Sequence, residues 1–196
     1  MPKNNVPYER SEPGALGMAA FGLTTVLLSL INAGVLPGSG LLIVLPMALI
    51  FGGFIQIIVG ILEFQRTNTF GGTSSCCYGA FWIWFASLQF LSSAKVIDLP
   101  ASHATYGAAL ILWGVLTLYL WICTFRQTRV TFVVFLTLWI DYFILGLGTI
   151  LESPQLLEAG GWLGIICGAT ALYGSFGTVV NATFRRCVLP LGAPLA

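Results

Sequence analysis

The chain has 196 residues, of which 57% are hydrophobic and only 8% are charged. A soluble globular domain carries about 25% charged residues, so a chain of this composition cannot cover a water-facing surface and is predicted to be a membrane protein. The formal net charge is +1, and no basic cluster exceeds the pair Arg185-Arg186, which argues against nucleic acid as a partner.

Six apolar segments follow one another along the chain, each close to the length of about 20 residues that crosses a bilayer. They cover residues 14–33, 41–64, 75–93, 105–125, 130–151 and 160–184. The third segment is short and rich in aromatic side chains. We therefore predict an all-α membrane protein with six transmembrane helices. A small polytopic chain without a large soluble domain is most simply a conduit for a small solute.

The connections between these segments differ in character. The sequence Arg-Gln-Thr-Arg at 126–129 predicts a tight turn between the fourth and fifth spans. Residues 66–77 are unusually polar for so short a connection. We expect them to form either a plain inner loop or a vestibule whose free backbone amides meet a solute.

The basic residues predict the orientation of the chain. All but Lys95 fall on one side of the six-span arrangement, namely Lys3, Arg10, Arg66, Arg126, Arg129, Arg185 and Arg186. Short loops rich in Lys and Arg stay in the cytoplasm, so both termini are predicted to be cytoplasmic. The chain then divides into a tail at 1–12, a transmembrane domain at 13–186 and a second tail at 187–196, in the plasma or bacterial inner membrane.

Neutral polar side chains within the spans are candidates for lining a path through the bilayer. They are Thr24, Thr25, Asn32, Gln56, Thr137 and Asn181. No Lys, Arg or His lies in the middle of a span, so a permeating anion would meet only neutral donors and helix N-termini. That arrangement favours weak and fast binding. For each residue the alternative role is a hydrogen bond that holds two helices together.

Two acidic residues require separate interpretations. Asp141 lies near the middle of the fifth span, where an ionised carboxylate costs about 2.5–3.5 kcal/mol. It is a possible proton site, with a satisfied hydrogen bond between helices as the alternative. Glu63 lies at a helix end, where it can pair with Arg66 at i,i+3. Together with Asn68, these residues are predicted to form a structural anchor at the inner mouth.

Gly160, Gly164 and Gly168 recur at four-residue spacing in the sixth span. Glycines so spaced allow two helix backbones to approach closely. The pattern predicts packing, either within one protomer or between protomers, and a flexible gating hinge is the functional alternative.

The sequence contains no constellation typical of an enzyme. It has no paired carboxylates and no Ser–His arrangement, and its five cysteines and single His lack the spacing of a metal site. We therefore expect neither catalysis nor a cofactor or metal.

Several motifs occur between about residues 12 and 192. The first span opens with Pro-Gly-Ala-Leu-Gly-Met-Ala-Ala-Phe-Gly at 13–22, and Gly52-Gly53-x-x-Gln56 begins a series that includes Asn-Thr-Phe-Gly at 68–71 and Tyr-Gly-x-Phe-Trp at 78–82. The sixth span contains Gly-Trp-x-Gly-x-x-Cys-Gly-Ala at 161–169. In these motifs the chain resembles the acetate uptake transporter family, which includes bacterial succinate–acetate permeases and fungal acetate transporters.

The resemblance implies a fold and a function. It implies six helices around a pore in each protomer, six protomers in the assembly, and transport of acetate and related small monocarboxylates, passively or with protons. It places the narrowest point of the pore at Phe21, Tyr78 and Leu138. The alternatives are a channel for another small solute, such as formate, ammonia or water, and a non-transporting membrane sensor or assembly protein.

The chain also departs from the family pattern. Glu12, Ala15 and Ala20 replace residues of the signature in the first span, and bacterial relatives carry an aliphatic residue where this chain has Asp141. These differences concern the details of substrate preference and proton sensing.

Overall fold

The computed structural model describes residues 11–195, and the secondary structure in this range is helical. In chain order the elements are α1 (Gly14–Asn32), η1 (Gly38–Gly40), α2 (Leu41–Met47), η2 (Ala48–Ile55), α3 (Gln56–Gln65), α4 (Thr69–Ser93), η3 (Pro100–Ser102), α5 (His103–Cys123), η4 (Thr124–Arg126), α6 (Arg129–Ile150) and α7 (Pro154–Phe184).

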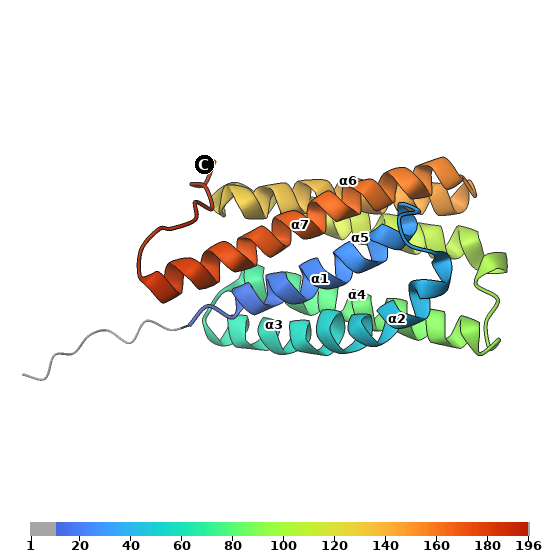
Figure 1. Ribbon diagram of the computed structural model, residues 1–196, viewed down its shortest axis with the longest axis horizontal. Coiled ribbons are helices and arrows are strands. Elements are labelled where there is room, and N and C mark those ends of the chain that lie inside the picture. The colour runs from blue at the N-terminus through green and yellow to red at the C-terminus, as the bar shows by residue number, and fades with distance from the viewer. Residues whose placement is uncertain (1–10, 196) are drawn as a thin grey trace, which may run out of the picture.

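Six long helical rods run along the bundle (Figure 1). Among the described residues, five stretches are long and apolar enough to cross a membrane, namely α1, the continuous stretch from η1 to α3, the stretch from α5 to η4, α6 and α7. The sixth rod is α4, which has 25 residues and begins with small and polar side chains. The prediction of an all-α membrane protein with six helical spans is confirmed.

The two ends of the described chain lie at the same end of the bundle (Figure 1). A bundle with an even number of spans has both chain ends on the same side. The arginines of the described part gather at that end, because Arg66 follows α3, Arg126 and Arg129 flank the turn before α6, and Arg185 and Arg186 follow α7. Lys95 lies in the connection at the opposite end. The predicted contributions of Lys3 and Arg10 lie outside the described residues.

The expectation of a plain inner loop at 66–77 is wrong, because α4 begins at Thr69. The alternative, a vestibule, is helical rather than irregular, and residues of this stretch line a cavity described below. The side chain of Asn68 accepts a hydrogen bond from the Gly71 N–H at 3.0 Å, which supplies the N-cap of this helix. Ser74 donates to the Phe70 carbonyl at 2.8 Å. Polar side chains that bond to their own helix are compatible with a buried helical stretch, so the polarity of this segment does not indicate a loop.

The last helix also begins earlier than the apolar pattern predicts, at Pro154 rather than near Gly160. Ser153 provides the N-cap by accepting from the Leu156 N–H at 3.5 Å, and Pro154 occupies the first helical position. Both residues favour these positions. The cap determines where the helix starts, whereas hydropathy reports only where it becomes apolar.

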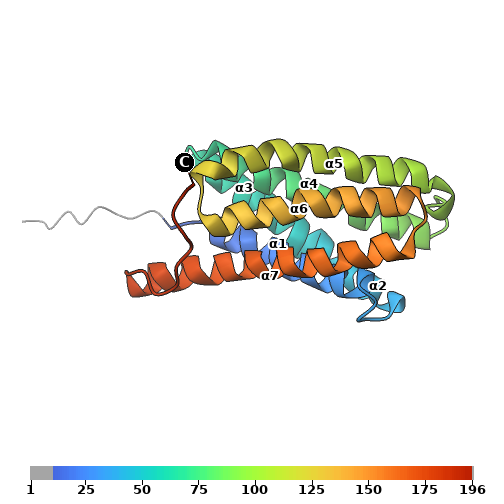
Figure 2. The ribbon, with the colours of Figure 1, turned by 90° about the horizontal axis from the view of Figure 1, so that it is seen from above.

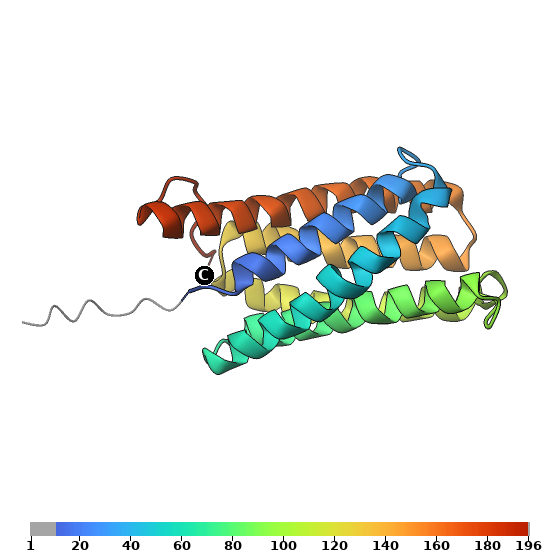
Figure 3. The same cartoon turned by 60° about the horizontal axis from the view of Figure 1, so that its bottom comes forward.

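The second span is not a uniform α-helix. It passes from α2 through the eight-residue π-helix η2 into α3 (Figure 3). Pro46 in α2 has no N–H to donate to the preceding turn, so the α-helical pattern is already interrupted there. Gly52 in η2 packs against α4, where a Cβ would lie 2.8 Å from Trp82 Cγ. π-helical turns are rare and often occur at functional sites.

Glycines bring two pairs of helices into close contact. A Cβ on Gly22 of α1 would lie 2.8 Å from the Gly168 carbonyl of α7, and one on Gly168 would lie 2.9 Å from the Gly22 carbonyl. Gly107 of α5 and Gly146 of α6 are related in the same way, at 2.6 and 2.9 Å. Such approach allows extensive packing without a hydrophobic driving force between helices in lipid. Figure 2 shows the result, with α6 between α5 and α7.

The glycine repeat of α7 packs within the protomer. Gly160 faces Leu145 of α6, and Gly164 faces Ser29 of α1. Gly168 completes the series at the α1 contact, and all three residues are buried. Of the alternatives that the sequence left open, packing inside one chain is therefore the arrangement that this structure displays.

The contact between α1 and α7 generates a prediction about stability. Gly22→Ala would force the two backbones apart, and overpacking of this kind costs about 1–3 kcal/mol. We expect a lower thermal unfolding midpoint in detergent, followed by tryptophan fluorescence. Gly38→Ala is the matched control, because nothing lies within 4 Å of a Cβ at that position. Equal midpoints for the two variants would contradict the proposed role of this contact.

Candidate functional site

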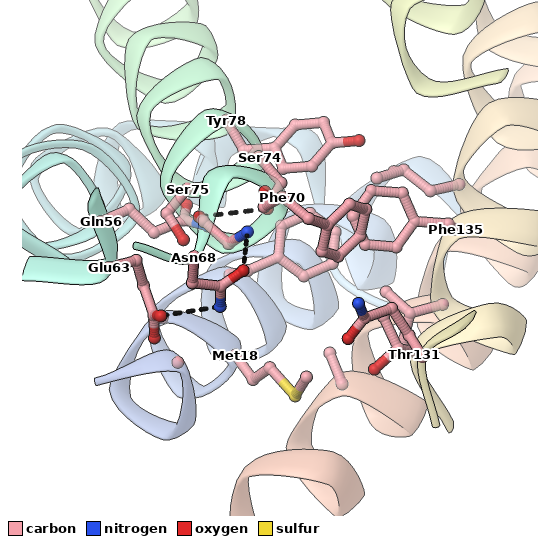
Figure 4. Close-up of a pocket in the computed structure, with 18 residues that line it drawn as sticks. Met18, Gln56, Glu63, Asn68, Phe70, Ser74, Ser75, Tyr78, Thr131 and Phe135 are labelled. Carbon is pink, nitrogen blue, oxygen red and sulfur yellow. Dashed lines mark hydrogen bonds between the residues drawn. The ribbon is translucent and has the colours of Figure 1, made fainter. Parts of the chain in front are cut away.

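A cavity of about 140 Å³ lies at the end of the bundle that holds the chain ends. Residues from the first halves of α1, α4 and α6 line it, together with residues from both ends of α3 and one from α7 (Figure 4). A void of about 10–15 Å³ already holds one water. The cavity therefore has room for a small organic acid accompanied by water.

Three residues predicted to form a constriction line the deep part of this cavity. Phe21 of α1, Tyr78 of α4 and Leu138 of α6 are 6%, 4% and 4% exposed. The ring centroids of Phe21 and Tyr78 are 5.8 Å apart. The structure thus brings together three side chains that are far apart in the sequence. We refer to Phe21, Tyr78 and Leu138 as the apolar ring.

The aromatic wall of the cavity is larger than the sequence predicts. Phe135 of α6 contacts Tyr78 edge-on, with centroids 5.8 Å apart, and Phe70 of α4 lies 5.1 Å from Phe135. Neither residue was predicted to be part of the site. Phe135 precedes Leu138 by three residues and therefore shares its helix face. This spacing is the signal that would have identified it.

The hydroxyl of Tyr78 is held by α5. It donates to Thr117 Oγ1 at 3.2 Å, and Thr117 donates to the Trp113 carbonyl at 2.8 Å. Thr117 is fully buried. The hydrogen bond fixes the orientation of the Tyr78 ring, so the cavity meets the ring rather than a free hydroxyl. No local pattern marks Thr117 as part of the site, because the contact joins residues 39 positions apart.

Glu63 and Asn68 form a polar pair in the outer part of the cavity (Figure 4). Glu63 is only 5% exposed, and its Oε2 accepts a hydrogen bond from Asn68 Nδ2 at 2.8 Å. Asn68 also donates its backbone N–H to the Glu63 carbonyl at 3.0 Å. Arg66 is the C-cap residue of α3. The predicted anchor at the inner mouth thus includes an amide–carboxylate contact that joins the end of α3 to the start of α4.

Gln56 is the predicted polar candidate that lines the cavity. It is the first residue of α3 and only 3% exposed, and Figure 4 shows it beside Ser75. Its Oε1 has no hydrogen-bond partner in the protein. A buried polar group without a partner is costly. Gln56 therefore contributes a buried hydrogen-bond acceptor without a protein partner to the wall of the cavity.

The other predicted polar candidates lie outside the lining of this cavity. Thr24 and Thr137 each donate to the carbonyl one turn earlier, at 2.8 Å. Thr25 is buried with an unpartnered hydroxyl, and Asn32 is the last residue of α1. The structure does not bring these four residues together with the apolar ring.

Asn181 supports the segment that follows α7. Its Oδ1 accepts from the N–H groups of Val188 and Leu189 at 2.7 and 2.9 Å, and its Nδ2 donates to the Leu189 carbonyl at 2.8 Å. The segment then turns back across the bundle, where the Leu195 N–H donates to the Phe125 carbonyl at 3.0 Å. Asn181 thus has all its polar atoms engaged away from the cavity.

Asp141 lies one turn beyond Leu138 on α6 and is not part of the cavity lining. It is 5% exposed, and its Oδ1 has no hydrogen-bond partner. A Cβ on Gly160 or on Gly164 of α7 would lie 3.1 Å from one of its carboxyl oxygens. The carboxyl group thus lies against the glycine repeat of α7.

Aromatic rings fill the bundle beyond the apolar ring. Phe81 packs against Trp113 and Tyr142, with centroids 5.4 and 5.2 Å apart, and against Trp82 at 5.4 Å. These residues belong to the buried core that also contains the apolar ring. The cavity therefore ends at the apolar ring, and packed side chains fill the bundle beyond it.

Comparisons with known proteins place this geometry among transport proteins. Residues 2–192 match the GPR1/FUN34/yaaH family. The chain is similar to the succinate-acetate/proton symporter SatP of Escherichia coli K12, with 38% identity over 182 residues that cover 93% of this chain and 95% of SatP. It is 31% identical to acetate permease A of Emericella nidulans over 195 residues, or 92% of this chain and 65% of that protein.

A solved structure has the same fold. The structure of the bacterial acetate channel SatP has a TM-score of 0.89 to this protein and 38% sequence identity. The match covers 94% of this chain and 100% of that chain. It extends over the helices that supply the cavity and the apolar ring.

The contact between Glu63 and Asn68 can be tested by placing a second negative charge beside Glu63. Asn68→Asp keeps an oxygen to cap α4 but replaces the amide donor by a second carboxylate, which repels Glu63. We expect the unfolding free energy to fall by about 1–3 kcal/mol, measured as thermal unfolding in detergent. Glu63→Gln in the same background removes one of the two charges and should recover most of the loss. Wild-type stability of the Asn68→Asp variant would show that the pair does not support the fold.

Proposed function

Because the chain belongs to the GPR1/FUN34/yaaH family, we propose that it carries acetate and related small monocarboxylates across a membrane, either passively or together with protons. The names of two relatives, a succinate-acetate/proton symporter and an acetate permease, support this substrate class. The single observation that carries the proposal is the cavity, in which polar side chains line the part before the apolar ring. We refer to these side chains, Gln56, Glu63 and Asn68, as the polar wall.

The two parts of the cavity suit the two ends of acetate. A methyl group can pass between Phe21 and Leu138 without loss of hydrogen bonds, whereas a hydrated inorganic ion must lose its water at an apolar constriction. Gln56 offers an unpartnered carbonyl oxygen just before this point, and this oxygen can accept a hydrogen bond from the neutral acid. Because this amide is neutral, it holds the solute weakly, and weak binding permits rapid release.

Glu63 affects whether the acid enters the cavity as an anion or as a neutral molecule. Its carboxyl lines the same cavity and is paired with a neutral amide. A carboxylate at this place opposes the entry of a bare anion. It thereby favours passage of the neutral acid, or of the anion accompanied by a proton.

The orientation and the assembly form part of the same proposal. Arginines at the end that holds the chain ends favour a cytoplasmic location for that end, so the cavity would face the cytoplasm. The family resemblance implies a homohexamer in the cell membrane. Large apolar side chains are exposed along the second span and α5, including Ile43, Phe54 and Leu112. They suit contact with lipid or with neighbouring protomers.

Leu138→Ala tests the apolar ring. Removing the isobutyl group widens the deep part of the cavity, so we expect acetate flux to persist and flux of lactate and succinate to rise several-fold. Uptake of labelled acids into proteoliposomes measures this ratio. Leu147→Ala is the control, because Leu147 is exposed on the same helix. Unchanged selectivity in the Leu138 variant would remove that residue from the constriction.

Gln56→Leu tests the polar wall. Loss of one neutral hydrogen bond of about 0.5–1.5 kcal/mol should lower acetate flux by about twofold to tenfold at low acetate concentration. Thermal stability should be unchanged or higher, because the substitution removes a buried polar atom that has no partner in the protein. Normal flux combined with reduced stability would instead assign Gln56 a structural role.

A further inference from the structure

Asp141 is a buried carboxyl group that the proposed path does not use. It lies in α6 three residues after Leu138, farther from the cavity than the apolar ring. A solute that leaves the cavity through the ring must pass the level of this residue. Asp141 is therefore placed to influence the second half of the path.

Its surroundings leave space for a carboxyl group without pairing it. The two oxygens lie against Gly160 and Gly164, in the positions where the methyl groups of two alanines would crowd them. Ser29 of α1 faces the same side of Gly164. Oδ1 nevertheless has no hydrogen-bond partner. The two glycines thus leave room for the carboxyl group, and one of its oxygens has no partner that would prevent it from carrying a proton.

In the part of the chain that the structure describes, no cation forms a salt bridge with Asp141 that would balance a negative charge. The salt bridge in this part joins His103 to Glu152. The titratable groups near the carboxyl are Tyr142 on α6 and Cys167 on α7. Both are neutral side chains, and the Cys167 thiol donates to the Val134 carbonyl at 3.4 Å. The α1 helix contributes Ser29, which does not ionise. An unpaired charge among these groups is unfavourable.

We propose that Asp141 is a proton-binding site and that the protein transports carboxylates only when this group is protonated. The inference rests on the proposed function. Protonation forms an O–H bond on one carboxyl oxygen, with the proton taken from the aqueous phase, and it removes a negative charge from beside the path. Ionised Asp141 repels a carboxylate that has passed the ring, so conduction stops as the group loses its proton.

The sign of the pH dependence follows from this arrangement. At acid pH Asp141 is neutral, and Asp141→Asn should transport acetate as well as the wild type does. At alkaline pH the wild type loses flux through ionisation, whereas Asn stays neutral. The ratio of variant to wild-type flux should therefore rise several-fold from acid to alkaline pH. Taking this ratio cancels the titration of acetate itself, which affects both proteins equally.

The experiment measures labelled acetate uptake into proteoliposomes at fixed total acetate over a range of pH. Glu158→Gln is the matched control, because it removes an exposed carboxyl from α7 and should follow the wild type. Asp141→Ser is a second neutral variant that replaces Asn if the latter does not fold. A folded neutral variant with the wild-type pH profile would overturn the proposal.

Infrared difference spectroscopy supplies a readout that is independent of transport. The protonated Asp141 carboxyl should contribute a carbonyl band that titrates with pH and is missing from Asp141→Asn. A band that titrates in a protein without acetate flux would reject the proposed function but support proton binding at Asp141. Absence of any band difference between the two proteins would reject the proton site even if acetate is transported.

Discussion

The hydrocarbon of the bilayer offers no hydrogen bonds to a peptide group, and this constraint shapes every part of the molecule. Backbone groups must pair within helices, so a solute path can be built only from side chains in the spaces between them. Glycine contacts such as Gly22 with Gly168 hold the helices close enough to define such spaces. The cavity, the apolar ring and the buried Asp141 all lie between helices packed in this way.

The six spans and the membrane class could be predicted from the sequence, because length and hydropathy are local properties that survive in the fold. The apolar ring could be anticipated only through motifs shared with a family. Phe21, Tyr78 and Leu138 are individually no different from other apolar residues, and nothing local places them in one cavity. Family resemblance thus supplied the long-range information that composition lacks.

What the sequence did not reveal depends on partners that are distant in the chain or on backbone geometry. The polar start of α4 favours a loop or a vestibule by composition, because the hydrogen bonds that Asn68 and Ser74 make to the backbone exist only once the helix has formed. Thr117 and Phe135 act through contacts with Tyr78. The π-helix η2 arises from a backbone register that hydropathy cannot distinguish from an ordinary helix.

The return of the C-terminal segment has a practical consequence. The chain does not leave the bundle at the end of α7 but crosses to the turn between α5 and α6, where Leu195 bonds to Phe125. Gln127 of the same turn lines the cavity. A fluorescent reporter attached next to Leu195 would therefore lie beside the turn that lines the cavity. Such a reporter needs a linker long enough to keep it clear of the cavity.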